Sequence, residues 1–284
     1  MKVLVAGSTG YLGSYIVKKL QRDNHQFKAV ARNVEKLSQL GIHESNIIKA
    51  EVTNKESLQD IFENIDAVIS TVGITRQKDN LTYMDVDYGA NKNLLDTAIK
   101  NGVKKFIYVS VLNGSQLRHT QICAAKEKFV DELKSSGIDY CVIRPSGFFS
   151  DMIEFFNMAK KGRIYLFGDG QFRSNPIHGE DLAEICINAL DKNYNEIAVG
   201  GPEILTQEEI AKIAFDTLRK KSKITYLPDW LRRAGLKIGK FLLPIHQYGP
   251  FEFFMNVMAM DLVGETYGKI NLYNYYKSLT ESNN

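Results

Sequence analysis

Cysteine and histidine are scarce in this sequence. Three cysteines occur, Cys123, Cys141 and Cys186, and they form neither a CxxC pair nor a cluster with histidine. The five histidines are scattered, with no carboxylate at ligand spacing. These patterns predict no metal site, and they favour reduced, mostly buried thiols over a disulfide framework.

An excess of charge of one sign is also missing. The formal net charge is +3 over 284 residues, which gives no basic field that would attract nucleic acid. No segment reaches the roughly 18 uninterrupted apolar residues of a membrane-spanning helix, and no signal peptide precedes the first apolar run. The sequence therefore predicts a cytoplasmic protein without a nucleic-acid partner. No heptad or interface stripe is visible, so the oligomeric state stays open.

Apolar runs rich in valine and isoleucine alternate with helical patterns through the first half of the chain. Strands are expected at 2–7, 27–32, 46–52, 66–73, 104–111 and 138–147, and helices at 11–20, 33–40, 55–65, 88–102 and 124–137. The helix at 88–102 should stop near Gly102. Nearly continuous apolar strands joined by helices predict an α/β fold, with a doubly wound parallel sheet covered on both faces.

The regularity weakens after residue 147. Residues 162–177 are expected to be rich in loops, and a helix is expected at 179–190. Thr206 and Glu209 match a capping box that starts another helix. Beyond Tyr226 the chain is aromatic, and we expect it to be irregular. We therefore divide the chain into a sheet domain, residues 1–147, and a smaller region interleaved with it, residues 148–284.

The first expected strand leads into a turn with three glycines and then into a helix. Gly7 permits a sharp turn, Gly10 lets a pyrophosphate approach the backbone, and Gly13 lets the helix pack closely on the strand. The N–H groups at the start of such a helix bind phosphates. The turn predicts a Rossmann-type NAD(P) site that also includes Ser8, Thr9, Tyr11 and Leu12. The alternative is a tight turn that binds no ligand.

The end of the second strand indicates which dinucleotide is bound. An NAD-binding chain usually has an acidic residue there, which binds the ribose hydroxyls. Here the strand ends in Ala31, Arg32 and Asn33, with no carboxylate. Arg32 can instead grip a 2′-phosphate through paired hydrogen bonds. We therefore favour NADP(H) over NAD(H). The alternative is that Arg32 is a solvated charge at the strand end.

Several motifs resemble the short-chain dehydrogenase/reductase superfamily, and within it the atypical, NmrA-like branch. They are the glycine spacing, VDYGANKNLLDTA, FIYVSV, Lys126 and VIRPSGFF. The later order RPSGFF, GRIYLFGDG, NPIHGEDLA and GGPEILT resembles proteins of the divinyl chlorophyllide reductase type. The resemblance extends from about residue 1 to residue 205. The branch also contains cofactor-binding regulators and accessory subunits of respiratory complex I.

The resemblance implies a set of site residues. Typical members use a serine near the end of the fifth strand, matched here by Ser110, and a Tyr-x-x-x-Lys motif, whose lysine is matched by Lys126. The tyrosine position is occupied by Ile122, which has no exchangeable proton. The resemblance also implies that backbone at Gly73 passes the cofactor. It further implies that the strand end formed by Pro145, Ser146 and Gly147 lies near the nicotinamide.

The missing tyrosine leaves three interpretations. The protein is an NADP(H)-dependent reductase of an apolar small molecule (an enone, quinone or conjugated alkene), with Ser110 and Lys126 in the site. Its proton then comes from water, the substrate, Cys123 or His119, which sits in a polar loop. Alternatively it is a non-catalytic NADP(H)-binding redox sensor, regulator or assembly factor. The third interpretation is a shifted helix register, but no nearby tyrosine fits, since Tyr108 lies in a strand and Tyr140 follows the helix.

The segment DWLRRAGLKIGKFLLP, residues 229–244, mixes basic and apolar side chains. A basic amphipathic helix can lie on a membrane surface. We favour the alternative of a lid or packing helix, because Gly235 and Gly239 weaken a helix. Residues 248–260 add aromatic residues and methionines, which suggest an apolar pocket, a partner surface or simply core packing.

Overall fold

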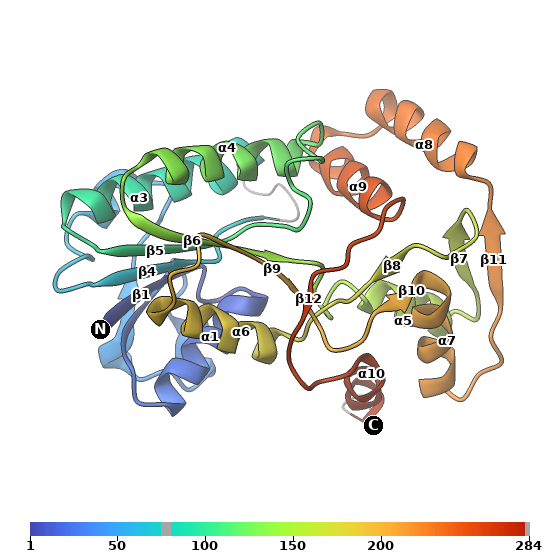
Figure 1. Ribbon diagram of the computed structural model, residues 1–284, viewed down its shortest axis with the longest axis horizontal. Helices are drawn as coiled ribbons and strands as arrows, with labels where there is room; N and C mark the ends of the chain where they lie inside the picture. The colour runs from blue at the N-terminus through green and yellow to red at the C-terminus, as the bar shows by residue number, and fades with distance from the viewer. Residues whose placement is uncertain (75–80, 282–284) are drawn as a thin grey trace. The chain divides into compact units, whose positions relative to one another are not determined.

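The computed structural model describes residues 1–74 and 81–281, and its contacts divide it into two compact units (Figure 1). The first unit comprises Met1–Arg144 and Leu182–Ile197, and the second comprises Pro145–Asp181 and Ala198–Asn284. The chain therefore passes between the units several times. Each unit is described by itself below.

A parallel sheet forms the centre of the first unit. Its strands are β1 (Lys2–Ala6), β2 (Gln26–Ala31), β3 (Ile47–Lys49), β4 (Ala67–Ser70), β5 (Lys105–Val109) and β6 (Asp139–Pro145). They stand in the order β6-β5-β4-β1-β2-β3, and neighbours pair in parallel. Strands β9 (Glu196–Gly200) and β12 (Glu265–Thr266) extend the sheet beyond β6. All six predicted strands and the doubly wound α/β fold are confirmed.

Helices cover both faces of this sheet. They are α1 (Tyr11–Arg22), α2 (Glu35–Gln39), α3 (Asn91–Lys100), α4 (Gln121–Ser135) and α6 (Gly179–Asn188). In Figure 1, α3 and α4 lie over one face and α1 lies over the other. α1 buries Leu12, Ile16 and Leu20, which are spaced four apart and so share one face of the helix. The hydrophobic pattern of the sequence thus fixes how these helices pack on the sheet.

Two of the predicted helices differ from those observed. Residues 55–65 form only a short 3-10 helix, Lys55–Leu58, followed by turns. Their apolar side chains are buried at helical spacing, but Asn64 adopts a left-handed backbone (φ 56°), which a helix cannot contain. The predicted helix at 88–102 begins earlier, as a π-helical segment Met84–Ala90 that runs into α3. Gly102 (φ 71°) follows α3, so the predicted stop is confirmed.

The second unit has more regular structure than predicted. Its strands are β7 (Ile164–Phe167), β8 (Arg173–Ser174), β10 (Leu205–Thr206) and β11 (Ile224–Leu227), and its helices are α5 (Ile153–Lys160), α7 (Gln207–Thr217), α8 (Asp229–Leu242), α9 (Ile245–Val257) and α10 (Leu272–Glu281). β7 pairs with β11 in parallel and β8 pairs with β10 antiparallel. α5, α7 and α10 enclose a separate core that contains Phe155, Phe215 and Tyr276.

Three expectations for this unit have clear outcomes. The capping box is confirmed, because the Thr206 hydroxyl accepts from the Glu209 N–H (3.1 Å) and the Glu209 carboxylate accepts from the Thr206 N–H (2.8 Å). The expectation of a loop-rich stretch at 162–177 is wrong in part, because β7 alternates buried and exposed side chains, which is typical of a half-buried strand. The expectation of an irregular chain after Tyr226 is wrong, since three helices follow it.

Candidate functional site

A cavity of about 270 Å³ opens at the carboxyl ends of the strands of the first unit. Its lining includes Gly7, Thr9 and Gly10 after β1, Ala31 and Arg32 at the end of β2, Glu51, Val52 and Thr53 after β3, and Thr71, Val72, Gly73 and Ile74 after β4. The strand order reverses between β1 and β4. Open α/β sheets bind ligands in the crevice at this point, so the cavity is the candidate site.

The three glycines of the first turn have different structural roles. Gly7 has φ +79°, and a Cβ atom there would lie 2.5 Å from Thr71 Oγ1. A Cβ atom at Gly13 would lie 2.1 Å from the Gly7 carbonyl oxygen. Gly10, the residue before α1, meets only one such neighbour, at 3.2 Å. The fold thus demands glycine at positions 7 and 13, whereas a Cβ atom at Gly10 would meet only that one backbone oxygen, at a distance that a small shift can relieve.

The start of α1 suits an anion. Its first turn contains no acidic side chain, and Gly10 brings no side chain that caps the helix. The first N–H groups of a helix have no acceptor within the helix, and the helix dipole is positive at this end. The glycine turn therefore fits the pyrophosphate of a dinucleotide, on the geometry of this chain as well as on the motif.

The different roles of Gly10 and Gly13 predict different effects when each is replaced by alanine. Gly13→Ala is expected to lower the free energy of unfolding by about 1–3 kcal/mol, because the new methyl group collides with backbone. Gly10→Ala is expected to leave stability nearly unchanged but to weaken dinucleotide binding. Urea unfolding and calorimetric titration of both variants measure the two effects. Equal stabilities for the two variants would contradict the assignment.

Other residues of the turn contribute differently from the prediction. The hydroxyl of Ser8, a predicted site residue, is buried and donates to the Val30 carbonyl (2.6 Å). Ser8 therefore ties the turn to β2 and offers a ligand only its backbone. Leu12 is buried in the helix–sheet contact, and Tyr11 packs edge-on against Tyr15. Among these residues, Thr9 lines the cavity.

Arg32 lies at the rim of the cavity beside the carboxylate of Glu51, which was not predicted as a site residue. Its side chain is 60% exposed, and its Nε lies 3.5 Å from Glu51 Oε2. Glu51 also accepts hydrogen bonds from the Thr53 N–H (3.2 Å) and hydroxyl (2.9 Å). The acidic residue absent from the end of β2 is thus replaced in space by one that follows β3. Both a cation and an anion therefore line this end of the cavity.

Lys126 forms a buried ion pair directly behind the cavity wall. Its Nζ lies 2.9 Å from Oδ1 of Asp87, whose side chain is fully buried in the π-helical segment. A Cβ atom at Gly73, which lines the cavity, would lie 2.8 Å from Lys126 Nζ and 2.7 Å from Asp87 Oδ1. Glycine at position 73 therefore brings the ion pair against the cavity. Neither Asp87 nor this packing role of Gly73 was predicted.

Burial and the ion pair act on the pKa of both groups. Burial raises the pKa of Asp87, while Lys126 and the Ile74 N–H, which donates to Asp87 Oδ2 (3.2 Å), oppose the rise. Burial by itself would lower the pKa of Lys126, but the charge and hydrogen bond of Asp87 act together with Tyr108 to raise that pKa above its ordinary value. Lys126 therefore presents an ammonium group at neutral pH.

The helix register in α4 follows the prediction. α4 is continuous from Gln121 to Ser135, so Ile122 and Lys126 lie one turn apart, and Ile122 is buried. Tyr108 lies in β5 and not on α4, as expected, although the Lys126 Nζ lies 5.6 Å from the centre of its ring. Tyr108 is fully buried, and burial raises the pKa of its phenol. It supports Lys126 from behind and does not replace the missing tyrosine at the cavity.

Ser110 belongs to a second buried network. Its hydroxyl donates to Glu127 Oε1 (3.0 Å), and Arg144 grips both oxygens of Glu127 (2.6 and 3.0 Å). Arg144 also donates to the Val111 carbonyl (3.0 Å). Burial by itself would lower the pKa of the Arg144 guanidinium, but Glu127 and Glu196 together raise it. In this structure the Ser110 side chain therefore joins β5 to a salt bridge between α4 and β6.

The two other proton-donor candidates differ in exposure. His119 is exposed in the turn before α4. Cys123 is fully buried, and burial raises the pKa of its thiol to about 11. A buried thiol of this kind contacts no solvent, so His119 is the more accessible of the two.

The remaining predicted site residues belong to the second unit. Pro145 ends β6, the buried Ser146 hydroxyl donates to the Asn175 carbonyl (2.6 Å), and the Gly147 carbonyl accepts from the Ile177 N–H (2.9 Å). Their place beside the nicotinamide stays a prediction. His178 accepts through Nδ1 from the Glu180 N–H (3.2 Å), as an anchor at the start of α6.

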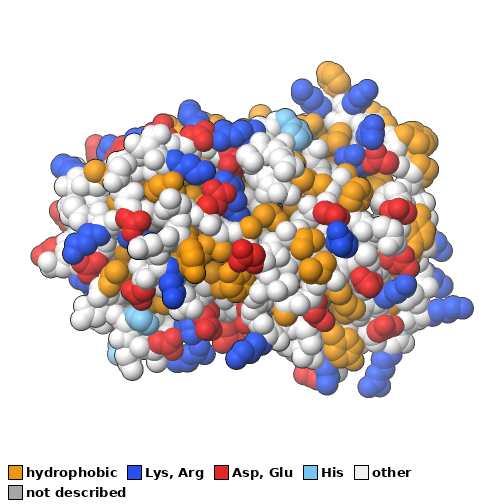
Figure 2. All heavy atoms as spheres, in the orientation of Figure 1, with side chains coloured by type: hydrophobic (Ala, Val, Ile, Leu, Met, Phe, Trp, Pro, Cys, Tyr) orange, Lys and Arg blue, Asp and Glu red, His pale blue; other side chains and the backbone are white. Residues whose placement is uncertain are grey.

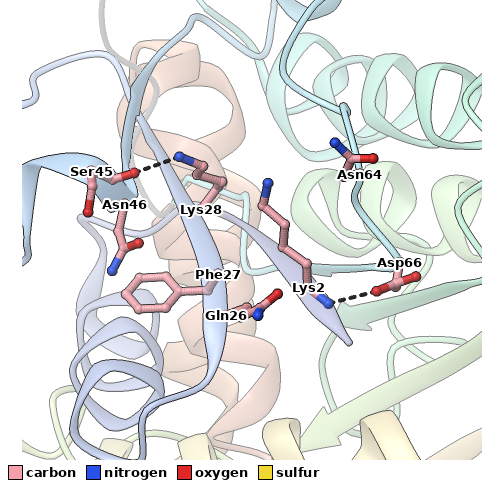
Figure 3. A pocket seen from close by; sticks show the side chains of 8 residues that line it. All are labelled: Lys2, Gln26, Phe27, Lys28, Ser45, Asn46, Asn64 and Asp66. Atoms are coloured by element: carbon pink, nitrogen blue, oxygen red, sulfur yellow. Dashed lines mark hydrogen bonds between the residues drawn. The ribbon is translucent and has the colours of Figure 1, made fainter.

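A second hollow lies at the opposite, amino-terminal ends of the strands (Figure 3). Lys28 Nζ donates to the Ser45 carbonyl (2.5 Å), and the Lys2 N–H donates to Asp66 (2.8 Å). Ligands of open α/β sheets bind at the carboxyl ends, so this hollow is not the candidate site. Within residues 1–74 and 81–281, no group of three histidine, cysteine or acidic side chains is placed to hold a metal ion.

Comparisons with known proteins agree with this geometry. Residues 7–193 match the NAD(P)H-binding family model. The chain is 31% identical to the divinyl chlorophyllide a 8-vinyl-reductase of Arabidopsis thaliana over 80% of this chain, but it spans only 60% of that relative's length. It is 31% identical to the photosystem II assembly factor Ycf39 of Synechocystis, covering 83% of this chain and 77% of that protein.

A solved structure shows the same fold. The NADPH-dependent quinone oxidoreductase QOR2 of Escherichia coli, complexed with NADPH, superposes with a TM-score of 0.71 at 16% identity, over 99% of this chain and all of that one. The glycine turn, the sheet order and the matched family model all point to one group of proteins. The chain belongs to the NAD(P)H-binding family and is an atypical short-chain dehydrogenase/reductase.

Proposed function

We propose that the chain is an NADPH-dependent reductase of an apolar small molecule, such as an enone, a quinone or a conjugated alkene. One observation carries the proposal: the Lys126 ammonium lies directly behind Gly73 in the wall of the cavity that begins at the glycine turn. If the glycine turn bound no ligand, a cation held beside this cavity by a fully buried carboxylate would have no evident structural purpose. It suits a group that fixes the nicotinamide end of a dinucleotide.

Different residues of the cavity would bind different parts of NADPH. The glycine turn and the start of α1 would hold the pyrophosphate, and Arg32 would hold the 2′-phosphate. Lys126 would hold the nicotinamide ribose, and its charge would favour negative charge that develops on a substrate nearby. The cofactor supplies the hydride. Ile122 leaves the cavity without the usual proton donor, so the proton would come from water or from His119.

This chemistry favours a conjugated acceptor. Hydride addition to a conjugated alkene or a quinone leaves an anion that is stabilised by delocalisation, so it depends less on an adjacent acid than carbonyl reduction does. A relative is named as a vinyl reductase, which agrees with this class of acceptor. The identity of the acceptor is left to experiment, because the chain spans only part of that relative.

Hydride transfer from stereospecifically deuterated NADPH tests the proposal. With a panel of quinones and enones, we expect deuterium to be lost from one face of the nicotinamide only. Lys126→Met should reduce the rate at least about 100-fold, within the range for removal of a positioned catalytic charge. Lys128→Met, an exposed lysine of the same helix, is the matched control and should retain the rate. Tight NADPH binding without turnover of any acceptor would overturn the reductase.

A second candidate is a non-catalytic NADPH-binding regulator or assembly factor. Ile122 favours it, since the position of the usual proton donor is apolar and buried. The relative named as a photosystem II assembly factor agrees with it. The deuterium experiment separates the candidates, because a regulator binds NADPH without transferring the label.

A further inference from the structure

Helix α8 and the first residue of α9 expose several large apolar side chains. Trp230 is 63% exposed, Ile238 56%, Phe241 85%, Leu242 75% and Ile245 65%. Trp230, Ala234, Ile238 and Phe241 recur every three or four residues, so they share one face of the helix. Large apolar side chains gathered on one face mark an interaction surface more often than single exposed ones do.

The opposite side of α8 is already occupied. A Cβ atom at Gly239 would lie 3.1 Å from the ring of Phe251 in α9, and one at Gly235 would lie 3.6 Å from it. Arg232 also donates to the Met255 carbonyl (3.2 Å). The two glycines let α9 approach closely, so α9 covers the glycine side. The face that carries Trp230 and Phe241 therefore plays no part in the packing of this helix pair.

Basic side chains border the exposed apolar face. Residues 230–247 contain Arg232, Arg233, Lys237 and Lys240 and no acidic residue. Asp229, just before them, pairs with Arg232 and Arg233 (both 2.6 Å). At 100° per residue, Arg233, Lys237 and Lys240 fall along one edge of the apolar face. Figure 2 shows hydrophobic and basic side chains lying side by side at upper right, where Figure 1 places α8.

We propose that α8 docks the protein in the plane of an anionic lipid bilayer. Its apolar side chains would enter the boundary between headgroups and acyl chains, while Lys237 and Lys240 would reach up to the headgroups. The positive border selects an anionic surface. α8 has 14 residues, fewer than the roughly 20 needed to cross a bilayer. No helix in the described part of the chain is long and apolar enough to span a membrane.

Flotation of the whole protein with lipid vesicles tests this proposal without any cofactor or turnover. We expect the protein to float with phosphatidylcholine vesicles that contain phosphatidylglycerol, and to stay behind with phosphatidylcholine alone. Lys237→Gln with Lys240→Gln should weaken binding on the order of 20-fold, at roughly fivefold for each basic residue. Lys36→Gln with Lys100→Gln changes the net charge equally at exposed sites elsewhere and should bind like the wild type.

The apolar contribution needs its own variant. Phe241→Ser with Leu242→Ser should abolish flotation and leave the folded state intact, since both side chains are exposed. Tyr194→Ser removes a comparably exposed aromatic residue (52%) outside α8 and should change nothing. Equal binding to both kinds of vesicle, or unchanged flotation of Phe241→Ser with Leu242→Ser, would overturn the proposal. So would a wild-type dimer in solution that this pair of substitutions dissociates, because a second copy would then cover the face.

Discussion

Replacing Lys126 by methionine is expected to lower the free energy of unfolding by about 3–5 kcal/mol near neutral pH. Methionine keeps most of the apolar stem, but it leaves Asp87 as an unpaired carboxylate with no exposed surface. The Ile74 N–H is a weak substitute for an ammonium group, because it already donates to the other carboxylate oxygen. The loss of stability should therefore exceed the loss caused by the same substitution at any surface lysine.

The loss should also depend on pH. Burial raises the pKa of Asp87 in the folded state, and Lys126 opposes that rise. Without Lys126 the pKa rises further. A carboxyl with a raised folded pKa costs nothing at a pH below its unfolded pKa, where it is protonated in both states, and the cost builds up as the pH rises from there to the folded pKa. The variant should therefore match the wild type most closely near about pH 4, the ordinary carboxyl range, and fall behind it toward neutral pH.

Urea unfolding of the wild type and three variants across this pH range tests this prediction. Lys126→Met combined with Asp87→Asn removes both charges and keeps an acceptor for Ile74, so it should recover most of the stability. Lys128→Met removes only a contact between the exposed ammonium and the ring of Tyr88 (4.2 Å) and should cost at most about 1 kcal/mol. A Lys126→Met loss that is the same at every pH would mean that Asp87 is not the group left uncompensated.

The parts of this site that could be predicted are those written in local sequence. The turn of Gly7, Gly10 and Gly13 stands between one strand and one helix, and its backbone requirements are the same in any chain with this spacing. The parallel strands were predictable for a similar reason, because β1, β4 and β5 at the centre of the sheet are nearly continuous buried runs. Arg32 was predictable as the residue at the end of β2.

The parts that could not be predicted are contacts between distant segments. Asp87 reaches Lys126 only because the π-helical segment packs against α4. Glu51 meets Arg32 because β3 pairs beside β2. No periodicity in the sequence encodes either meeting. Residue character alone was also misleading in α8, where Gly235 and Gly239 weaken an isolated helix but admit the ring of Phe251.

Arg32→Ala is expected to weaken NADPH binding about 10- to 100-fold while changing NADH binding less than about threefold. A hydrogen bond to a charged group contributes about 1.5–3 kcal/mol, and about 1.4 kcal/mol corresponds to a factor of ten. The difference between the cofactors arises because only NADPH carries the 2′-phosphate that Arg32 would grip. Calorimetric titration of the ligand-free protein with each nucleotide measures it. Arg22→Ala, which removes an equally exposed arginine (61%) outside the cavity, is the matched control.

Glu51 should also affect the preference for NADPH over NADH, because its carboxylate and a 2′-phosphate would both bind the Arg32 guanidinium. In this structure its carboxylate lies beside Arg32 and accepts from Thr53, so a 2′-phosphate would have to displace it from the guanidinium or bind against its repulsion. Glu51→Gln should therefore tighten NADPH binding several-fold and weaken NADH binding, because a carboxylate accepts from ribose hydroxyls more strongly than an amide does. If Arg32→Ala instead weakened both nucleotides equally and Glu51→Gln weakened NADH alone, Glu51 would be the ribose acceptor. The chain would then be selective for NADH.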